Sequence, residues 1–180
     1  MTRRDPVGGW NFTVSLVDSS SVTAVVVGAV AALTGPSTNG FSECSGLETS
    51  MTVEEYREGG RNDTVLRFPG RTSWSPIRLR RGVVANPELW KWYEGFLKGQ
   101  GKRRDGVITL LDQLGMPVRV WRFHRGLPSK WSGPALHATQ NAVAIEELEI
   151  VHEGIRPEGG GVVSQIAGTM SSIASSLGDL

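Results

Sequence analysis

The sequence is poor in the residues that most often build disulfides and metal sites. It contains one cysteine, Cys44, and three histidines among 180 residues. A single cysteine excludes an intrachain disulfide, which fits folding in a reducing cytosol. Because no histidine lies near it in the sequence, we interpret Cys44 as a small buried residue. His124, His137 and His152 lack the spacing of metal ligands on one helix, so we expect no metal and no cofactor.

Long hydrophobic runs are also missing. The apolar stretch at residues 22–33 is shorter than the roughly 20 residues that a membrane-spanning helix needs. Two arginines near the start are not followed directly by an apolar run, so the pattern of a secretory signal is absent. We expect no membrane anchoring by this chain.

The sequence shows no arrangement typical of a catalytic site. The neighbouring acids Glu54–Glu55 and Glu146–Glu147 would point to opposite faces of a strand, so neither pair can act together as acid and base. The order of serine, histidine and aspartate that marks a nucleophilic triad is not found. Nor does a known nucleic-acid-binding motif accompany the basic residues. We expect that the protein is not an enzyme.

Charge is balanced overall but segregated along the chain. The formal net charge is +1, yet residues 1–60 carry −4, residues 61–130 carry +10 and residues 131–180 carry −5. Two interpretations remain open. The blocks can neutralise one another within one fold, or they can present complementary patches to other copies of the chain.

Short β-prone segments separated by turn residues dominate the middle of the chain. Pro69-Gly70 is expected to end one of them, and the segment around Trp131 is expected to be a loop rich in turns. The predicted strands are 12–17, 41–44, 47–58, 64–68, 77–83, 107–112, 117–124 and 143–151. Alternating strands and helices are not seen, so the fold class is mainly β (α+β), a small β-barrel or sandwich with one flanking α-helix.

The one clear helix is predicted at residues 87–98. Asn86 is a good N-cap, Pro87 suits the first helical position, and Gly99 with Gly101 ends the helix. A stripe of apolar residues at helical spacing is expected to pack on the core. The stripe consists of Leu89, Tyr93, Phe96 and Leu97, with Trp90 beside it.

The domain is expected to cover residues 1–155. An apolar loop is inserted at about 19–39, where a hairpin, a packed loop and a segment that orders on contact with a neighbour all fit the composition. Residues 156–180 form a Gly/Ser-rich C-terminal tail, which is either disordered or docked on a partner.

The last predicted strand interleaves Glu146, Glu147 and Glu149 with apolar residues, whereas a half-buried strand should alternate cleanly. We interpret this as a strand with one face on its own core and the other towards neighbouring subunits or a channel. The acids are expected at the solvated positions.

Five motifs in order carry a resemblance: EEYREGG, FPGRT, LRRG, PSKWSGP and AIEELEIVHEG. Over residues 5–155, apart from the insertion, the chain resembles the inner-tube proteins of contractile phage tails and extracellular contractile injection systems, which are related to type VI secretion tube proteins. The resemblance implies hexameric rings that stack into a hollow tube, with a continuous β-barrel lining the lumen. It also implies that the predicted helix covers this barrel from outside.

The same resemblance implies the partners. They are other copies of the chain, a sheath protein whose contraction drives the tube through a target envelope, baseplate or spike and cap proteins, and a lumen cargo of protein or DNA. The tube would be assembled in the bacterial cytoplasm, as part of a phage tail or a released phage tail-like particle.

Charged side chains are the candidate contacts between subunits. Reversing the charges of Glu54 and Glu55 is expected to impair tube assembly more than subunit folding. The candidates are Glu54, Glu55, Arg57, Glu58, Arg78, Arg80, Arg81, Arg103 and Arg104. Two alternatives stay open: a cap, adaptor or baseplate protein of the same fold, and a monomeric β-barrel that binds a small ligand.

Overall fold

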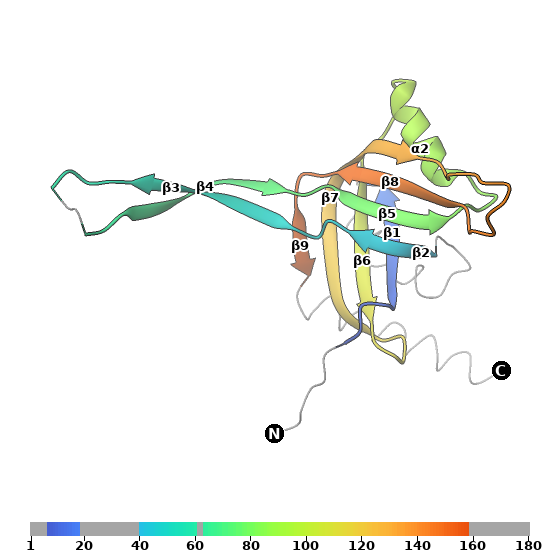
Figure 1. Ribbon diagram of the computed structural model, residues 1–180, viewed down its shortest axis with the longest axis horizontal. Helices are drawn as coiled ribbons and strands as arrows, with labels where there is room; N and C mark the ends of the chain where they lie inside the picture. The colour runs from blue at the N-terminus through green and yellow to red at the C-terminus, as the bar shows by residue number, and fades with distance from the viewer. Residues whose placement is uncertain (1–6, 19–39, 61–62, 159–180) are drawn as a thin grey trace.

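The structure is a computed structural model that describes residues 7–18, 40–60 and 63–158 (Figure 1). The expectations for the insertion at 19–39 and for the tail beyond residue 158 lie outside these residues. Within them the chain is built mainly from β-strands, with one α-helix. This confirms the predicted fold class.

Two sheets share one long strand, β7. The β6 sheet has the order β1-β6-β7-β9, and the β8 sheet has the order β2-β5-β8-β7. The neighbouring strands in both sheets are antiparallel. The strands of the β6 sheet are β1 (Phe12–Asp18), β6 (Arg104–Leu111), β7 (Pro117–Ser132) and β9 (Ile155–Glu158). Those of the β8 sheet, besides β7, are β2 (Phe41–Ser45), β5 (Ile77–Gly82) and β8 (Ile145–Val151).

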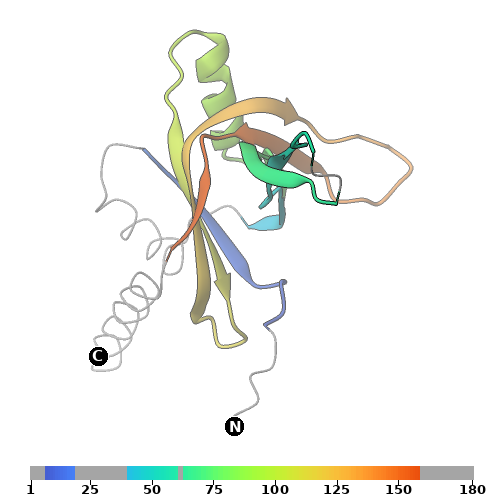
Figure 2. The same cartoon turned by 90° about the vertical axis from the view of Figure 1, so that its left-hand side faces the viewer.

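β7 passes from one sheet to the other without a break. Its first part pairs with β6 and β9, and Leu127–Ser132 pairs with β8 across an irregularity between Pro128 and Lys130. Figure 2 shows β7 as a long arc that links the two sheets. The prediction of a loop around Trp131 is therefore wrong. A bend at Pro128, which has no N–H to donate, lets the strand change sheets instead of ending.

The core lies between the two sheets. Ile77, Leu79, Leu148 and Ile150 from the β8 sheet are fully buried against a second group from the β6 sheet, Val14, Ile108 and Phe123. Phe123 lies over Gly106, where an added methyl group would overlap its ring. Glycine is thus required at position 106 by close packing.

The remaining two strands form a separate hairpin. β3 (Thr49–Tyr56) pairs only with β4 (Leu66–Trp74) in the described part of the chain, and the ribbon extends far from the body (Figure 1). Pro69-Gly70 does not end β4, as the sequence suggested. It lies at a bulge between the pairs Met51↔Thr72 and Val53↔Pro69. A free two-stranded ribbon tolerates proline because many of its amides have no partner to bond.

The helix α2 (Glu88–Leu97) packs beside β7 at one end of the core. The predicted cap is wrong by one residue: Pro87 is the N-cap, and Asn86 supplies only its carbonyl, to the Arg81 side chain at 3.4 Å. The predicted end is confirmed, with Gly99 in a left-handed conformation. Leu89, Tyr93 and Phe96 pack on the core as predicted. Trp92 is buried with them, whereas Leu97 is 64% exposed and does not belong to the buried stripe.

The last strand, β9, lies partly beyond the expected domain end at residue 155. Residues 155–158 pair with Val120–Phe123 of β7, so the sheet includes the start of what the composition suggested was a linker.

Candidate assembly surfaces

The acids of β8 divide between its two faces. Glu146 lies on the core face with Leu148 and Ile150, and Glu147 and Glu149 lie on the opposite face. The expectation that the acids occupy solvated positions is therefore right for Glu147 and Glu149, which are part-exposed, and wrong for Glu146, which is buried.

The buried carboxylate of Glu146 is held by two donors. The Arg81 Nε donates to its Oε1 at 2.6 Å, and the Trp131 Nε1 donates to its Oε2 at 3.1 Å. The Arg81 side chain is only 1% exposed. Arg81 was expected to contact another subunit, but it lies inside its own, because the strand period places it on the core face with Leu79.

The opposite face of the β8 sheet carries a ladder of paired charges. Arg80 lies between Glu43 at 3.0 Å and Glu147 at 3.5 Å, and Arg78 pairs with Glu149 at 3.3 Å. The strand register places these residues opposite one another on β2, β5 and β8. With two arginines and three glutamates, the ladder neutralises most of its own charge.

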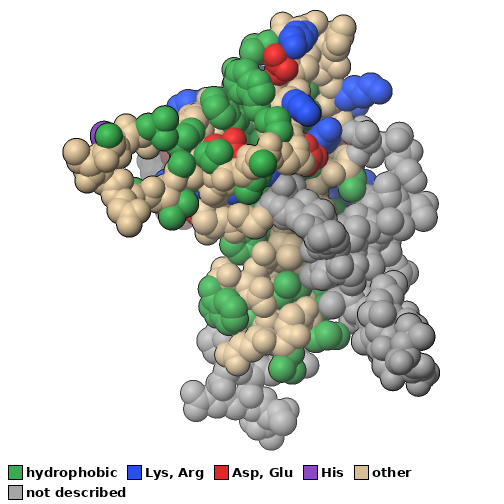
Figure 3. Space-filling model, turned by 90° about the vertical axis from the view of Figure 1, so that its right-hand side faces the viewer, with side chains coloured by type: hydrophobic (Ala, Val, Ile, Leu, Met, Phe, Trp, Pro, Cys, Tyr) green, Lys and Arg blue, Asp and Glu red, His purple; other side chains and the backbone are tan. Residues whose placement is uncertain are grey.

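The basic segment before β6 is neutralised in the same way. Arg103 pairs with Glu153 at 3.2 Å, and Arg104 pairs with Glu88 at 3.4 Å and lies over the Trp92 ring. On the face shown in Figure 3, basic and acidic side chains are interspersed around the upper part of the molecule. Of the two interpretations of the charge blocks, these pairs favour neutralisation within one fold.

The candidate residues of the hairpin lie apart from those of the body. Glu54, Glu55, Arg57 and Glu58 are all exposed at the far end of the β3–β4 hairpin. Glu55 pairs with Arg67 of the same hairpin at 3.3 Å. The structure thus groups these four residues, and it separates them from the basic candidates on the body.

Apolar side chains on the hairpin are the feature that the sequence reasoning missed. Five of them are between 37% and 58% exposed: Met51, Val53, Tyr56, Leu66 and Phe68. The register places Met51 and Val53 on one face of the ribbon and the other three on the opposite face. An isolated two-stranded hairpin is marginally stable in water. In the sequence, apolar residues occupy positions that point to both faces of these strands. This pattern is the signal that could have indicated exposed apolar side chains.

The root of the hairpin is tied to the turn between β8 and β9. The His152 ring is buried there, with its Nε2 3.1 Å from the Ser75 carbonyl oxygen and its Nδ1 3.2 Å from the Gly154 amide nitrogen. Trp74, the last residue of β4, packs against the same ring. His152 is thus a buried polar residue at the base of the hairpin.

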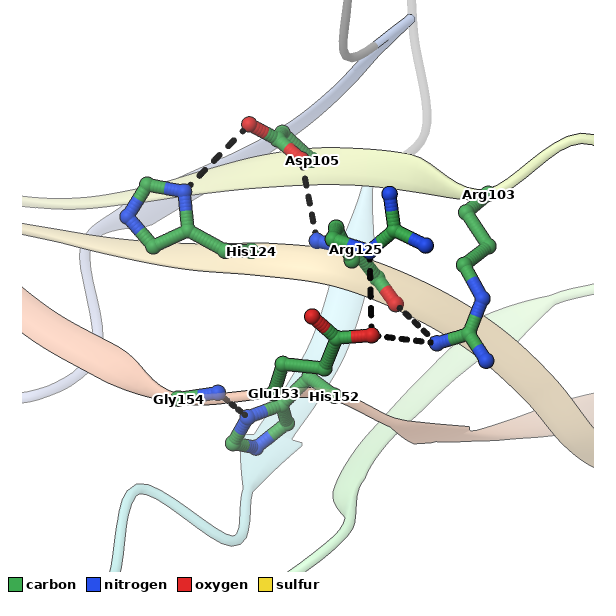
Figure 4. Close-up of polar contacts among 7 residues, drawn as sticks. All are labelled: Arg103, Asp105, His124, Arg125, His152, Glu153 and Gly154. Carbon is green, nitrogen blue, oxygen red and sulfur yellow. Dashed lines mark hydrogen bonds and ion pairs between the residues drawn. The ribbon is translucent and has the colours of Figure 1, made fainter.

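The same turn is fixed to the β6 sheet (Figure 4). The Glu153 carboxylate lies 3.0 Å from the Arg125 Nε and 3.2 Å from an Arg103 nitrogen. Arg125 has a positive φ of 52°, an unusual value for a non-glycine residue, and its amide donates to Asp105 Oδ1 at 2.9 Å. This polar network connects the hairpin root to the body.

Asp105 is the charged centre of that network. Burial alone would raise the pKa of its carboxyl group, but the Arg125 amide, the hydrogen bond and charge of Arg122, and His124 together hold the pKa below its usual value. Asp105 therefore remains a carboxylate and can hold the strained Arg125 backbone in place.

In the described part of the chain, no group of three or more histidine, cysteine, aspartate or glutamate side chains is placed to hold a metal ion. The same residues include no helix with the length and apolar character that crossing a membrane requires.

Comparison with known proteins places this geometry in context. The family model described as T4-like virus tail tube protein gp19 matches residues 9–156. A search of curated proteins gave no match.

Solved structures show the same fold. A chain of the anti-feeding prophage baseplate, 6-fold symmetrised, is 26% identical with a TM-score of 0.72, covering 87% of this chain and 98% of that one. A chain of the sheath-tube complex of the extracellular contractile injection system PVC, in the extended state, is 24% identical with a TM-score of 0.69, covering 86% and 92%. A chain of the anti-feeding prophage cap is 20% identical with a TM-score of 0.72, covering 89% and 95%.

Proposed function

We propose, from the fact that this chain belongs to the T4-like virus tail tube protein family, that it is a structural, non-catalytic subunit that joins copies of itself into stacked hexameric rings. The rings form the hollow inner tube of a phage tail or phage tail-like particle.

The observation that carries this proposal is the β3–β4 hairpin. It extends away from the body with apolar side chains exposed on both faces, and it makes no third strand pairing in the described residues. Apolar patches of this kind mark surfaces that bind other proteins. A second copy of the chain covers the ribbon in our proposal and supplies the stability that two strands alone lack.

The β8 sheet supplies the ring contact in the same proposal. In the part of the chain that the structure describes, β2 pairs only with β5, and the segment Leu127–Ser132 of β7 pairs only with β8. Such free edges invite pairing with another chain, and a head-to-tail contact that closes gives a ring. The related baseplate chain comes from a structure with six-fold symmetry, which supports a ring of six.

The ladder of paired charges then faces the lumen. Since Arg78 and Arg80 are neutralised by Glu149, Glu43 and Glu147, this wall is polar without a strong net sign. A sheath protein, a baseplate and a cap are the expected further partners, because the similar chains come from complexes named for these parts. Transport of cargo through the lumen stays a prediction.

The buried interior favours a tube subunit over a ligand-binding barrel, because side chains such as Phe123, Leu148 and Ile150 fill the centre of the space between the sheets. A cap or adaptor of the same fold is the second candidate, since similar chains come from a cap and from a sheath/tube terminator. Self-stacking separates these two functions.

Negative-stain electron microscopy of the purified protein tests the proposal, with light scattering at several concentrations. We expect hollow tubes or stacked six-fold rings. The double variant Tyr56→Ser/Phe68→Ser is expected to fold but not to assemble, while the control Leu97→Ser, which removes an equally exposed apolar residue from α2, assembles normally. Wild-type protein that stays monomeric at every concentration indicates a cap or adaptor. Normal tubes from the double variant would show that the hairpin is not the contact.

A further inference from the structure

His152 joins two parts of the molecule that are otherwise only loosely connected. Its ring is 7% exposed and lies between Trp74 of the hairpin, at 6.2 Å between ring centroids, and Phe123 of the core, at 5.9 Å. Its two nitrogens contact backbone groups on opposite sides: the Ser75 carbonyl at the end of β4 and the Gly154 amide in the turn before β9.

These contacts define one tautomer of the neutral ring. The Gly154 amide can only donate, so Nδ1 accepts and carries no proton; Nε2 then carries the hydrogen and donates to the Ser75 carbonyl. A protonated ring has two N–H donors and no acceptor. Protonation would therefore set the Nδ1 hydrogen against the Gly154 amide hydrogen and remove this bond.

Ser75 links the two chain segments that enter the hairpin at its base. Its amide donates to the Glu48 carbonyl at 3.2 Å, and its hydroxyl lies 3.3 Å from the Glu48 carboxylate. Gly46, two residues before Glu48, has a φ of +88°, and a methyl group there would overlap the Pro76 carbonyl. The two chains entering the hairpin are thus packed together where His152 holds Ser75.

The turn that carries His152 is itself immobilised by the body. The Glu153 amide donates to the His124 carbonyl at 3.0 Å, and the His124 amide donates to the Gly154 carbonyl at 3.1 Å. Arg125, the next residue of β7, is bound through its amide to Asp105. Figure 4 shows the Asp105 carboxylate beside the Arg125 amide, the Arg125 side chain beside Glu153, and the Gly154 amide beside the His152 ring.

The charged groups around His152 are engaged with other partners. Glu153, next in the chain, is paired with Arg103 and Arg125; Glu48, from the hairpin side, bonds Ser75. From the β6 sheet, Asp105 is paired with Arg122 and approaches His124 at 3.4 Å. Among the described residues, the His152 ring contacts the Ser75 carbonyl, the Gly154 amide and two aromatic rings, none of which is an anion that would stabilise a proton on it.

Burial lowers the pKa of His152 below 6.5, and it outweighs the hydrogen bonds with Ser75 and Gly154, which would raise it. The direction of the pH dependence follows from proton linkage, because the folded root of the hairpin binds the proton less tightly than the opened root does. The stability of the root is therefore complete above about pH 6.5, the ordinary value for histidine, and falls as the pH drops below it.

We infer that His152 is a positioning residue, which in its neutral form fixes the direction in which the β3–β4 hairpin leaves the body and on protonation releases it. The inference rests on the proposed function, because the hairpin matters as the contact between subunits. Acid would then loosen the tube at its joints without unfolding the subunit.

Hydrogen exchange of the full-length protein, followed by mass spectrometry on peptides covering residues 46–76, tests this at several pH values, with rates corrected for intrinsic exchange. For the wild type we expect the opening equilibrium of the root to rise by up to about fivefold between pH 6.5 and 5.5, the limit for one linked proton whose pKa in the opened root is about 6.5. His152→Asn keeps an acceptor near the Gly154 amide but does not titrate, so its opening should not change with pH. The control His137→Asn, in an exposed loop, should behave as the wild type.

A wild-type root whose protection does not change with pH, or a pH step that persists in His152→Asn, overturns the inference. If His152→Asn fails to fold, the wild-type ring is titrated by NMR instead. A Gly154 amide signal that moves with the His152 titration supports the inference, and one that does not move refutes it. Exchange is measured on dissociated subunits and tubes are scored separately by microscopy. If tubes form but the exchange protection shows no pH step, only this inference is refuted. If the protection shows a pH step but no tubes form, only the proposed function is refuted.

Discussion

Replacing Glu146 with alanine should destabilise the subunit far more than replacing its neighbour Glu147. Glu146 is the buried partner of Arg81, with the two side chains 8% and 1% exposed, and it also accepts the Trp131 indole hydrogen. Alanine would leave the Arg81 guanidinium in the core without its counter-charge and the Trp131 N–H without an acceptor.

The magnitude follows from these contacts. Removing one member of a buried ion pair costs about 3–5 kcal/mol, because the other charge stays buried. Glu147, by contrast, pairs with Arg80 on the solvent face, where the side chains are 35% and 44% exposed. Pairs of that kind contribute at most about 1 kcal/mol. For a chain of this size, a loss of about 4 kcal/mol lowers the melting temperature by about 8–16 °C.

Guanidinium unfolding followed by circular dichroism, at one protein concentration for all variants, measures the difference. A third variant, Arg81→Met/Glu146→Leu, removes both charges and should recover most of the stability, since apolar residues can replace a buried pair at little cost. Equal losses for Glu146→Ala and Glu147→Ala would refute the reasoning. So would a double variant that is less stable than Glu146→Ala.

Three further predictions follow from single side chains. Burial, with the charge of Glu43, raises the pKa of Cys44 to about 12, so iodoacetamide at pH 8 should alkylate it roughly a thousandfold more slowly in the native than in the denatured protein; equal rates would contradict this. Asp105→Asn should lower the free energy of unfolding by about 1–3 kcal/mol at pH 7. Because the native pKa of Asp105 is lowered, this difference in stability from the wild type should narrow as the pH falls below about 4. If the reasoning is wrong, unfolding titrations at pH 7 and pH 3 would show the same difference in stability. Gly46→Ala should lose more stability than Gly60→Ala, because the two glycines have φ of +88° and +89° and only Gly46 faces a neighbouring carbonyl; equal losses in thermal melts would exclude the steric cause.

The strand pattern predicted local structure well where residues alternate in type. Ile77 and Leu79 lie on one face of β5 and Arg78 and Arg80 on the other, as the alternation within the predicted strand 77–83 indicates. The same period of two puts Arg81 and Glu146 on their core faces. Their pairing depends on the register between β5 and β8, which are more than 60 residues apart in sequence. Local pattern cannot supply that register, so Arg81 was assigned to a contact between subunits and Glu146 to a solvated position.

Turn-forming residues do not mark strand ends where the chain uses them inside strands. Pro69-Gly70 and Pro128 are strong local breakers, but both lie at irregularities within continuous pairing. The exposed apolar side chains of the hairpin were missed for a different reason. Residues such as Met51 and Phe68 look like ordinary strand residues, and only the three-dimensional arrangement shows that no core lies beneath them.

The strand that the two sheets share has a mechanical consequence. β7 runs for 16 residues, a contour of roughly 50 Å at about 3.3 Å per residue. A push applied to one sheet reaches the other through the covalent backbone of β7, and the sheets can slide apart only if β7 unpairs from β8 or from both β6 and β9. A subunit built in this way resists shear as a single rigid body, which is the property that a rod under axial load needs if it is not to buckle.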